Sequence, residues 1–254
     1  MSKTMIISGA SRGIGAAIAM EASEKGFNLV LNARSKNALD KMAGSLSRGS
    51  TGVAVVSGDV SEQAVCERIT GTAVERFGGV DVLVNNAGIL EPVGPLDAVD
   101  ADAWVQNLIV NVAAPVRLTK CALSSLRRRQ GCVLNISSGA AVKAVRGWSA
   151  YCTSKAALNH FNRMLSAEYP EITAVAISPG MTATDMQRTI RERGKGNMPE
   201  DEYRRFVTAY ESGELRSPER VARAIVAIAL NPPRALNGEF VTVEDPRVAS
   251  LLVG

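Results

Sequence analysis

Short apolar runs alternate along the chain with longer segments in which apolar residues recur at helical spacing. Six of these runs are apolar almost throughout: MIIS, LVL, VAVV, VLV, VLNI and AVAI. Such runs are typical of parallel strands that are covered on both faces. The order of segments therefore predicts right-handed βαβ units in an α/β fold, with a doubly wound parallel sheet and helices on both faces.

The boundaries of the expected elements follow from the same pattern and from the turn residues between segments. Seven strands are expected, at residues 4–8, 28–32, 52–57, 80–85, 132–136, 172–178 and 239–243. Helices are expected at residues 13–25, 35–46, 62–77, 101–126, 148–168 and 217–230. Because no linker or repeat interrupts this order, residues 1–254 are expected to form a single domain.

Residues 181–216 break the alternation of strands and helices. The segment is polar, contains RERGKGNMPEDEYRR, and separates an expected strand from the last expected helix. Its position makes it a candidate helical lid over a substrate site. Its composition is equally compatible with a solvated helical insertion.

Charge and hydropathy argue against nucleic-acid and membrane partners. The formal net charge is +4, but the basic residues are mostly interleaved with acidic ones. The densest basic cluster, Arg127–Arg129, lies at an expected helix end, where cations are favoured by the helix dipole. No apolar run is long enough to span a bilayer, and the N-terminus has no signal-peptide pattern. We therefore expect a cytoplasmic protein.

Metal and thiol chemistry find little support. The 4 cysteines (66, 121, 132 and 152) have no paired spacing, and His160 is the single histidine. A zinc site needs about four closely spaced ligands, so no metal is expected. Cys152 and His160 stand eight residues apart on one expected helix, too far for a direct hydrogen bond. His160 is therefore expected to be a structural or surface residue.

A glycine-rich loop, SGASRGIG, follows the first expected strand and opens the first expected helix. Its glycines are spaced G-x-x-x-G-x-G, which differs from the G-x-G-x-x-G spacing of many dinucleotide sites. Glycines here allow a tight turn and a close approach of backbone N–H groups to a pyrophosphate at the helix N-terminus. The candidate cofactor-binding residues are Gly9, Ser11, Arg12, Gly13, Ile14 and Gly15.

The residues after the second strand indicate which dinucleotide binds. A carboxylate at this point accepts hydrogen bonds from the adenosine ribose and repels a 2′-phosphate. The sequence has Ala33 followed by Arg34 and no acid. Together with Arg12, the Arg34 guanidinium suits a phosphate, so we expect NADPH rather than NADH. The alternative is that Arg34 is a solvated residue at a strand end.

Several polar residues are expected at the carboxyl ends of the strands, where open α/β sheets form their sites. The fourth strand ends in NNAG (85–88), and the fifth places Ser137 and Ser138 at its end. Asn111 lies in an otherwise apolar helical stretch. Tyr151 and Lys155, in YCTSK, are four residues apart and share one face of an expected helix.

Taken together, these motifs resemble the short-chain dehydrogenase/reductase family over essentially the whole chain. The motifs are the glycine loop, Asp59-Val60, NNAG, Asn111, Ser138, Tyr151, Lys155 and PGMTAT at 179–184. Ser138 precedes Tyr151 by thirteen residues, as in the family. The resemblance implies a single-domain Rossmann fold, an NADP-dependent oxidoreductase and a small-molecule carbonyl substrate.

The resemblance also implies catalytic roles that elementary chemistry supports. Tyr151 would donate a proton to the carbonyl oxygen, and the charge of Lys155 would lower the phenol's pKa. Lys155 would also bond the nicotinamide ribose, and Ser138 would hold the substrate oxygen. Asn111 would distort its helix and hold a water that relays protons to Lys155. The hydride is expected from the pro-S face.

The same family pattern assigns the remaining cofactor contacts. Asp59 would bond the adenine amino group, with Val60 giving a backbone contact. Asn86, Ala87 and Gly88 would line the adenosine ribose. Residues expected around the nicotinamide carboxamide are Pro179, Gly180, Thr182 and Thr184.

Several phrases, among them GILEPVGPL and NGEFVTVED, resemble the branch that contains sepiapterin and benzil reductases. Sepiapterin reductases carry an aspartate in the last strand, where this chain has Thr242, and Glu244 and Asp245 would point differently. An α-dicarbonyl is therefore favoured over a pterin as the substrate. Leu90, Trp148 and Met186 are candidates for an apolar pocket wall, or are plain core residues.

Other functions stay open. Sepiapterin reduction, 3-ketoacyl reduction and NAD-linked alcohol oxidation are alternatives within the family chemistry. A non-enzymatic NADPH-sensing protein is an alternative of another class, although such proteins typically lose the tyrosine or the lysine. By resemblance we expect a homodimer or homotetramer formed through helices 101–126 and 148–168. The C-terminal tail, 245–254, would pack on a neighbour or fold back.

Overall fold

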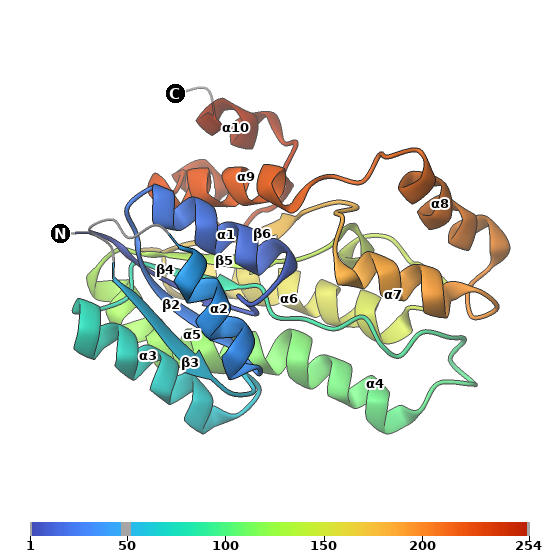
Figure 1. Ribbon diagram of the computed structural model, residues 1–254, viewed down its shortest axis with the longest axis horizontal. Helices are drawn as coiled ribbons and strands as arrows, with labels where there is room; N and C mark the ends of the chain where they lie inside the picture. The colour runs from blue at the N-terminus through green and yellow to red at the C-terminus, as the bar shows by residue number, and fades with distance from the viewer. Residues whose placement is uncertain (1, 47–51, 253–254) are drawn as a thin grey trace.

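The computed structural model of the protein describes residues 2–46 and 52–252. Within these residues, seven strands form one parallel sheet in the order β3-β2-β1-β4-β5-β6-β7 (Figure 1). The strands are β1 (Thr4–Ser8), β2 (Asn28–Ala33), β3 (Val53–Ser57), β4 (Val82–Asn85), β5 (Cys132–Ile136), β6 (Thr173–Ser178) and β7 (Phe240–Thr242). The predicted fold is confirmed, with strand ends within a few residues of those expected.

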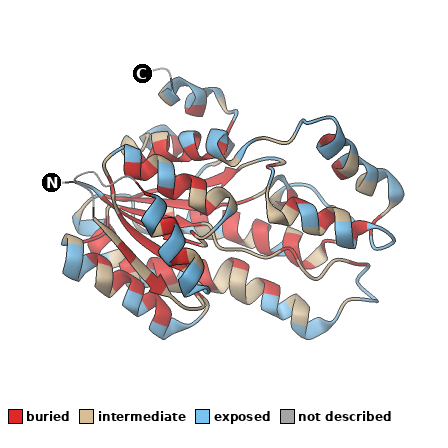
Figure 2. Cartoon of the chain, in the orientation of Figure 1, coloured by how far each residue is buried: buried red, intermediate tan, exposed pale blue. Residues whose placement is uncertain are grey.

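Helices cover both faces of the sheet. One face carries α1 (Gly13–Glu24), α2 (Lys36–Ser45) and α9 (Pro218–Leu230), and the other carries α3 (Gln63–Phe77), α5 (Ala114–Arg128) and α6 (Ser149–Glu168). Figure 2 shows buried residues on the helix faces that turn toward the sheet and exposed residues on their outer faces. The doubly covered sheet explains why the strands are apolar throughout.

Alternate residues of each strand pack into different cores. In β1, Met5 and Ile7 pack against α1 and α9, whereas Ile6 packs against α3 and α5. All three side chains are fully buried. Each apolar side chain buried in this way contributes about 1.5–3 kcal/mol to folding.

The long helix expected at 101–126 is divided into three segments. It consists of α4 (Ala101–Leu108), a π-helical turn (Ile109–Ala113) and α5. Asn111 lies in the middle of the π-helical turn and is fully buried. The helix is therefore distorted at the residue for which a distortion was expected.

The insertion at residues 181–216 contains α7 (Asp185–Gly194) and α8 (Glu200–Glu211). Figure 1 shows both helices beyond the end of the sheet, with α7 nearer to α6 than α8 is. After β7 the chain forms α10 (Pro246–Ala249) and a short 3₁₀ turn (Ser250–Leu252) that packs on α9, and residues 253–254 of the tail lie outside the described range. Short 3₁₀ turns also occur at Gly139–Ala141 and Arg234–Leu236.

The basic cluster at the end of α5 is engaged within the chain. Arg129 pairs with Asp81 at 3.0 Å, and Arg127 pairs with Glu171. No helix among the described residues is both long and apolar enough to cross a membrane. In the same part of the chain, no group of three or more His, Cys, Asp or Glu residues could hold a metal ion.

Candidate active site

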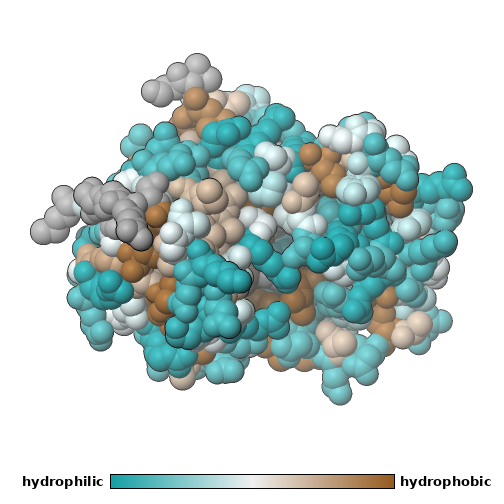
Figure 3. All heavy atoms as spheres, in the orientation of Figure 1, coloured by the Kyte–Doolittle hydropathy of each residue, from teal (hydrophilic) through white to brown (hydrophobic). Residues whose placement is uncertain are grey.

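The strand order reverses between β1 and β4, and a cavity of ≈ 510 Å³ opens there at the carboxyl ends of the strands. In Figure 3 the surface is hollowed near its middle, and both hydrophilic and hydrophobic residues border the hollow. Predicted site residues that line the cavity are Gly9, Ser11, Arg12, Gly13, Ile14, Arg34, Asp59, Val60, Asn86, Ala87, Gly88, Tyr151, Lys155, Pro179 and Thr184.

Five predicted site residues do not line this cavity: Gly15, Asn111, Ser138, Gly180 and Thr182. Ser137, which was expected at this strand end, also lines the cavity. Lining residues that the sequence did not indicate are Asn32, Ser35, Ala38, Gly58, Ile89, Val110, Ile136 and Asp185. Most of the lining residues that were not predicted are one or two positions away from a motif residue in the sequence. Extending each motif by two residues would therefore have included them.

The glycine loop and the NNAG segment are packed closely together. Asn86 Nδ2 donates to the carbonyls of Ser8 at 2.9 Å and Gly9 at 3.2 Å. Ser8 Oγ accepts from the backbone N–H groups of Asn86 and Ala87 at 3.0 and 3.1 Å. A Cβ at Gly15 would stand 2.3 Å from the Gly9 carbonyl oxygen, so this position excludes a side chain. Because Gly15 has no side chain, the first turn of α1 can pack directly on the Gly9 carbonyl of the loop.

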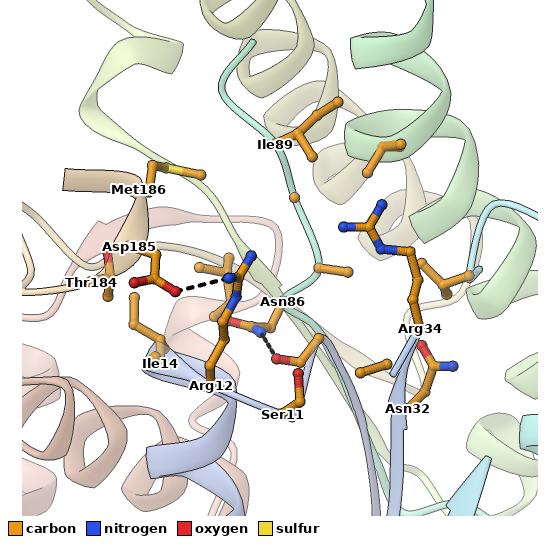
Figure 4. A pocket seen from close by; sticks show the side chains of 18 of the residues that line it. Ser11, Arg12, Ile14, Asn32, Arg34, Asn86, Ile89, Thr184, Asp185 and Met186 are labelled. Atoms are coloured by element: carbon orange, nitrogen blue, oxygen red, sulfur yellow. Dashed lines mark hydrogen bonds and ion pairs between the residues drawn. The ribbon is translucent and has the colours of Figure 1, made fainter. Parts of the chain in front are cut away.

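The two arginines that the sequence analysis grouped around one phosphate have different partners. Arg12 Nη1 bonds Asp185 Oδ2 at 2.8 Å (Figure 4). Arg188 pairs with the same carboxylate at 2.9 Å. Arg34 is exposed at the end of β2 and has no ion pair within the described residues. Both arginines line the cavity, so a joint arginine site stays a prediction, although the start of α7 lies beside the glycine loop and its Asp185 engages Arg12.

Tyr151 and Lys155 lie on one face of α6 and are 6% and 5% exposed. Lys155 Nζ donates to the Ile136 carbonyl at 2.8 Å and stands 5.6 Å from the centroid of the Tyr151 ring. Tyr151 Oη contacts Met186 Sδ at 3.8 Å, a weak hydrogen bond. The pair is therefore buried side by side, as its spacing predicted.

The electrostatics of this pair differ from the expected lowering of the tyrosine pKa. Burial raises the pKa of Tyr151 to about 12, and the Ser138 hydroxyl only partly opposes that rise. Burial lowers the pKa of Lys155 to about 8. Desolvation dominates both groups here and the ammonium is directed at a backbone carbonyl, so the lowering of the Tyr151 pKa by the charge of Lys155 stays a prediction.

Asn111 links the π-helical turn to the chain that follows β4. Its Oδ1 accepts from the Ile89 N–H at 2.9 Å, and its Nδ2 donates to the Ile89 carbonyl at 2.8 Å. Nδ2 also lies 2.8 Å from Asn107 Oδ1 and 3.1 Å from Ser154 Oγ. The amide is therefore occupied by protein groups and fixes the cavity wall at Ile89.

An apolar cluster surrounds the side of Tyr151 away from the sheet. Leu90 and Trp148, both candidates for a pocket wall, are buried in it, and Met186 packs against it and lines the cavity. The insertion 181–216 contributes Ile190, Met198 and Phe206. The insertion therefore covers the tyrosine with apolar side chains.

At the end of β7, where sepiapterin reductases carry an aspartate, the carboxylates of Glu244 and Asp245 are both paired with arginines. Thr242 is exposed and pairs in register with Ser178. Glu244 forms an ion pair with Arg216, and Asp245 pairs with Arg247 at 2.8 Å. His160 is exposed on α6.

Comparison with known proteins gives matches over nearly the whole chain. A family model described as short chain dehydrogenase matches residues 3–195. An uncharacterised oxidoreductase of Schizosaccharomyces pombe is 35% identical over 94% of this chain and 95% of its own length. A benzil reductase of Saccharomyces cerevisiae, described as (S)-benzoin forming, is 32% identical over 98% of both chains. The solved structure of the KRED1-Pglu enzyme is 37% identical, with a TM-score of 0.90 over 94% of this chain and 100% of that one.

Proposed function

The chain belongs to the short-chain dehydrogenase family, and from this premise we propose that it is an NADPH-dependent carbonyl reductase acting on one carbonyl of an α-dicarbonyl. The resemblance expected from the sequence motifs is confirmed, and the protein is an oxidoreductase. Members of this family bind a nicotinamide cofactor.

The observation that carries the proposal is that one cavity combines a cation suited to a phosphate with a buried Tyr–Lys pair. Arg34 lines the cavity beside β2, and Tyr151 and Lys155 line it beside α6. The glycine loop and Asn86 line the same cavity, and Figure 4 shows Arg12, Asn86 and Arg34 around it. This combination supports a redox dinucleotide better than it supports a mononucleotide or a purely structural cleft.

The residues of the cavity fit NADPH. Gly9 and Gly13 have φ values of +67° and +56°, so the loop bares its backbone N–H groups at the start of α1, where a pyrophosphate is stabilised. Asp59 and Val60 would contact the adenine, and residues 86–88 the adjoining ribose. Lys155 would bond the nicotinamide ribose.

The loop after β6 would enclose the nicotinamide carboxamide. Pro179 and Thr184 line the cavity, and Thr182 Oγ1 bonds the Pro179 carbonyl at 3.2 Å. Gly180 has a φ of +69°, and a Cβ there would stand 2.0 Å from Arg216 Nη1. Gly180 and Thr182 would therefore shape this loop and bring Pro179 and Thr184 to the cofactor.

The choice of NADPH over NADH rests on Arg34. No carboxylate stands beside it at the end of β2, where the preceding residue is Ala33. An exposed guanidinium without an acidic partner gains two charge-assisted hydrogen bonds from a 2′-phosphate. Because Arg12 pairs with Asp185, its contribution to phosphate binding is expected to be smaller.

The chain's own groups handle the proton. When bound, NADPH supplies the hydride that adds to the carbonyl carbon. Tyr151 donates its phenolic proton to the carbonyl oxygen, and Ser138 holds that oxygen in place. A pKa of about 12 keeps the phenol protonated at neutral pH, so the donor is ready for reduction. The Lys155 ammonium would stabilise the phenolate that remains. Because the Asn111 amide is occupied by protein groups, a water that returns the proton through Lys155 would be held by the main chain of Asn111.

An α-dicarbonyl is favoured by the apolar cluster around Tyr151 and by the similarity to a benzil reductase. Sepiapterin reduction finds less support, because Glu244 and Asp245 are paired with arginines. An NAD-linked alcohol dehydrogenase is disfavoured by Ala33 and Arg34. A non-enzymatic sensor is disfavoured because Tyr151 and Lys155 are both present.

The insertion 181–216 would act as a lid that opens to admit the substrate, since it covers Tyr151.

A homodimer or homotetramer would form through α4, α5 and α6, which expose Val105, Val116 and Met164 respectively. Light scattering at several protein concentrations measures the mass of the assembly.

The test is cofactor oxidation by the purified protein, with NADPH and NADH in parallel, against benzil, butane-2,3-dione, sepiapterin and acetoacetyl-CoA. The proposal expects NADPH-dependent reduction of the diones. Turnover of sepiapterin or acetoacetyl-CoA alone would contradict the proposal of an α-dicarbonyl substrate. A preference for NADH would contradict the proposal of NADPH as the cofactor. Tight NADPH binding without turnover of any carbonyl would favour the sensor.

A further inference from the structure

The two tryptophans of the chain differ in the state of their indole N–H groups. Trp104 is half-buried, and its Nε1 donates to Ser149 Oγ at 3.1 Å. Trp148 is 5% exposed, and its Nε1 is buried with no hydrogen-bond partner among the described residues. An unsatisfied buried donor is unfavourable and rare in native proteins. Trp148 therefore needs an explanation that Trp104 does not.

Trp148 lies beside the proposed proton donor. It caps the N-terminus of α6, three residues before Tyr151. Its ring meets the Tyr151 ring edge to face, with the centroids 5.8 Å apart and an interplanar angle of 89°. The indole therefore packs directly on the ring of the residue that serves the reacting oxygen.

The side chains that cover the indole offer it no strong acceptor. Phe206 of α8 packs against the Trp148 ring with centroids 5.1 Å apart. Leu90, Ile190 and Met198 belong to the same buried apolar cluster. Hydrocarbon and thioether groups accept hydrogen bonds weakly or not at all. The Trp148 N–H has no partner among the described residues, so an oxygen of a bound ligand would be its first acceptor.

We infer that Trp148 Nε1–H hydrogen-bonds the second carbonyl oxygen of the substrate, the one that is not reduced. The inference rests on the proposed function and assigns the group that distinguishes a dicarbonyl from a simple ketone. The two oxygens of an α-dicarbonyl are on adjacent carbons, so they need two neighbouring donors. Tyr151 serves the first oxygen and Trp148 serves the second.

The inference requires the substrate to enter where the insertion now packs. Tyr151 Oη contacts Met186 Sδ, and Met186 lines the cavity. A carbonyl that reaches the phenol takes the place of this thioether and comes against the same apolar cluster. A site that leaves a buried donor unpaired discriminates against ligands that lack the matching acceptor. Trp148 is thereby a specificity-determining residue for the proposed reaction.

The kinetic test compares matched substrates in matched variants. Trp148→Phe removes the N–H and keeps an aromatic ring, and Trp104→Phe is the control that removes the paired N–H. Each variant and the wild type are assayed with NADPH against benzil and against deoxybenzoin, in which one carbonyl is a methylene. The wild-type ratio of kcat/KM for these substrates accounts for their different intrinsic reactivity.

Trp148→Phe is expected to lower the benzil-to-deoxybenzoin ratio of kcat/KM by ~10-fold or more, the effect of an unmade buried hydrogen bond. Trp104→Phe is expected to leave the ratio within about twofold of wild type. An unchanged ratio in Trp148→Phe would overturn the inference and leave the proposed function standing. Failure of the wild type to reduce any ketone would overturn both.

A spectroscopic test does not depend on the folding of Trp148→Phe. In Trp104→Phe, Trp148 is the only indole, and ultraviolet resonance Raman bands report its N–H hydrogen bonding. Addition of butane-2,3-dione to the variant saturated with NADP⁺ is expected to shift these bands toward the hydrogen-bonded position. Butan-2-one is expected to leave them unchanged. Equal spectra with both ligands bound would refute the inference.

Discussion

Replacement of Lys155 by methionine should make the protein more stable while it removes activity. Lys155 is buried, and its pKa falls from 10.5 to about 8 because of desolvation. At ~1.4 kcal/mol per pKa unit, this difference corresponds to about 3 kcal/mol of cost for the buried charge. Loss of the bond to the Ile136 carbonyl offsets about 1 kcal/mol of the gain. The net expectation is a stabilisation of about 2 kcal/mol, or ~4–8 °C in Tm for a chain of this size.

The pH dependence of this effect has a definite sign. Between pH 8 and 10.5 the folded wild type releases the Lys155 proton, whereas the unfolded chain keeps it. The unfolded state then binds more protons, so wild-type stability rises with pH through this window. The advantage of Lys155→Met is therefore complete near pH 7 and shrinks as the pH approaches 10.5.

Thermal denaturation followed by circular dichroism at pH 7 and pH 9.5 measures the Tm difference between Lys155→Met and the wild type and its dependence on pH. Lys120→Met, at an exposed position of α5, is the matched control and should change Tm by little at either pH. A lower Tm for Lys155→Met than for wild type, or a gain that does not depend on pH, would refute the assignment of a costly buried charge. Loss of turnover is expected in the same variant, because no ammonium remains to stabilise the phenolate.

Three other substitutions test the cofactor site, and a fourth lies outside it. Arg34→Ala should raise the KM for NADPH by ~10-fold or more and leave the KM for NADH nearly unchanged, since it removes charge-assisted bonds to the 2′-phosphate. Arg12→Ala should change the ratio of the KM values for NADPH and NADH much less. Equal effects of the two variants would contradict the proposal that Arg34 is the main ligand of the 2′-phosphate. Gly15→Ala should abolish cofactor binding measured by fluorescence titration, because its Cβ would stand 2.3 Å from the Gly9 carbonyl oxygen. In contrast, Gly71→Ala in α3, where a Cβ meets nothing within 4 Å, should stabilise the protein by about 0.5–1 kcal/mol in urea denaturation.

The features that could be predicted from the sequence are those with a local cause. Continuous apolar runs such as residues 29–31 and 174–177 predicted doubly covered strands, and the structure confirms them. Tyr151 and Lys155 share a helix face because of their spacing alone. The glycine loop could be placed because it joins a strand to a helix. Each of these depends on neighbouring residues and on helix or strand geometry.

The remaining features depend on contacts between distant parts of the chain. Arg12 and Asp185 are 173 positions apart, and no pattern near either residue indicates their ion pair. The raised pKa of Tyr151 comes from burial beneath α7 and α8, a quantity that only the packed structure supplies. The unpartnered N–H of Trp148 likewise became visible only when its surroundings were known.

The central claim is that Tyr151 delivers the proton in an NADPH-dependent carbonyl reduction. The most direct measurement is NADPH oxidation with benzil by the wild type and by Tyr151→Phe, together with NADPH titration of both proteins by fluorescence. The account predicts turnover by the wild type, at least ~100-fold lower turnover by Tyr151→Phe, and the same NADPH affinity in both. Turnover by Tyr151→Phe at a rate close to that of the wild type would contradict it.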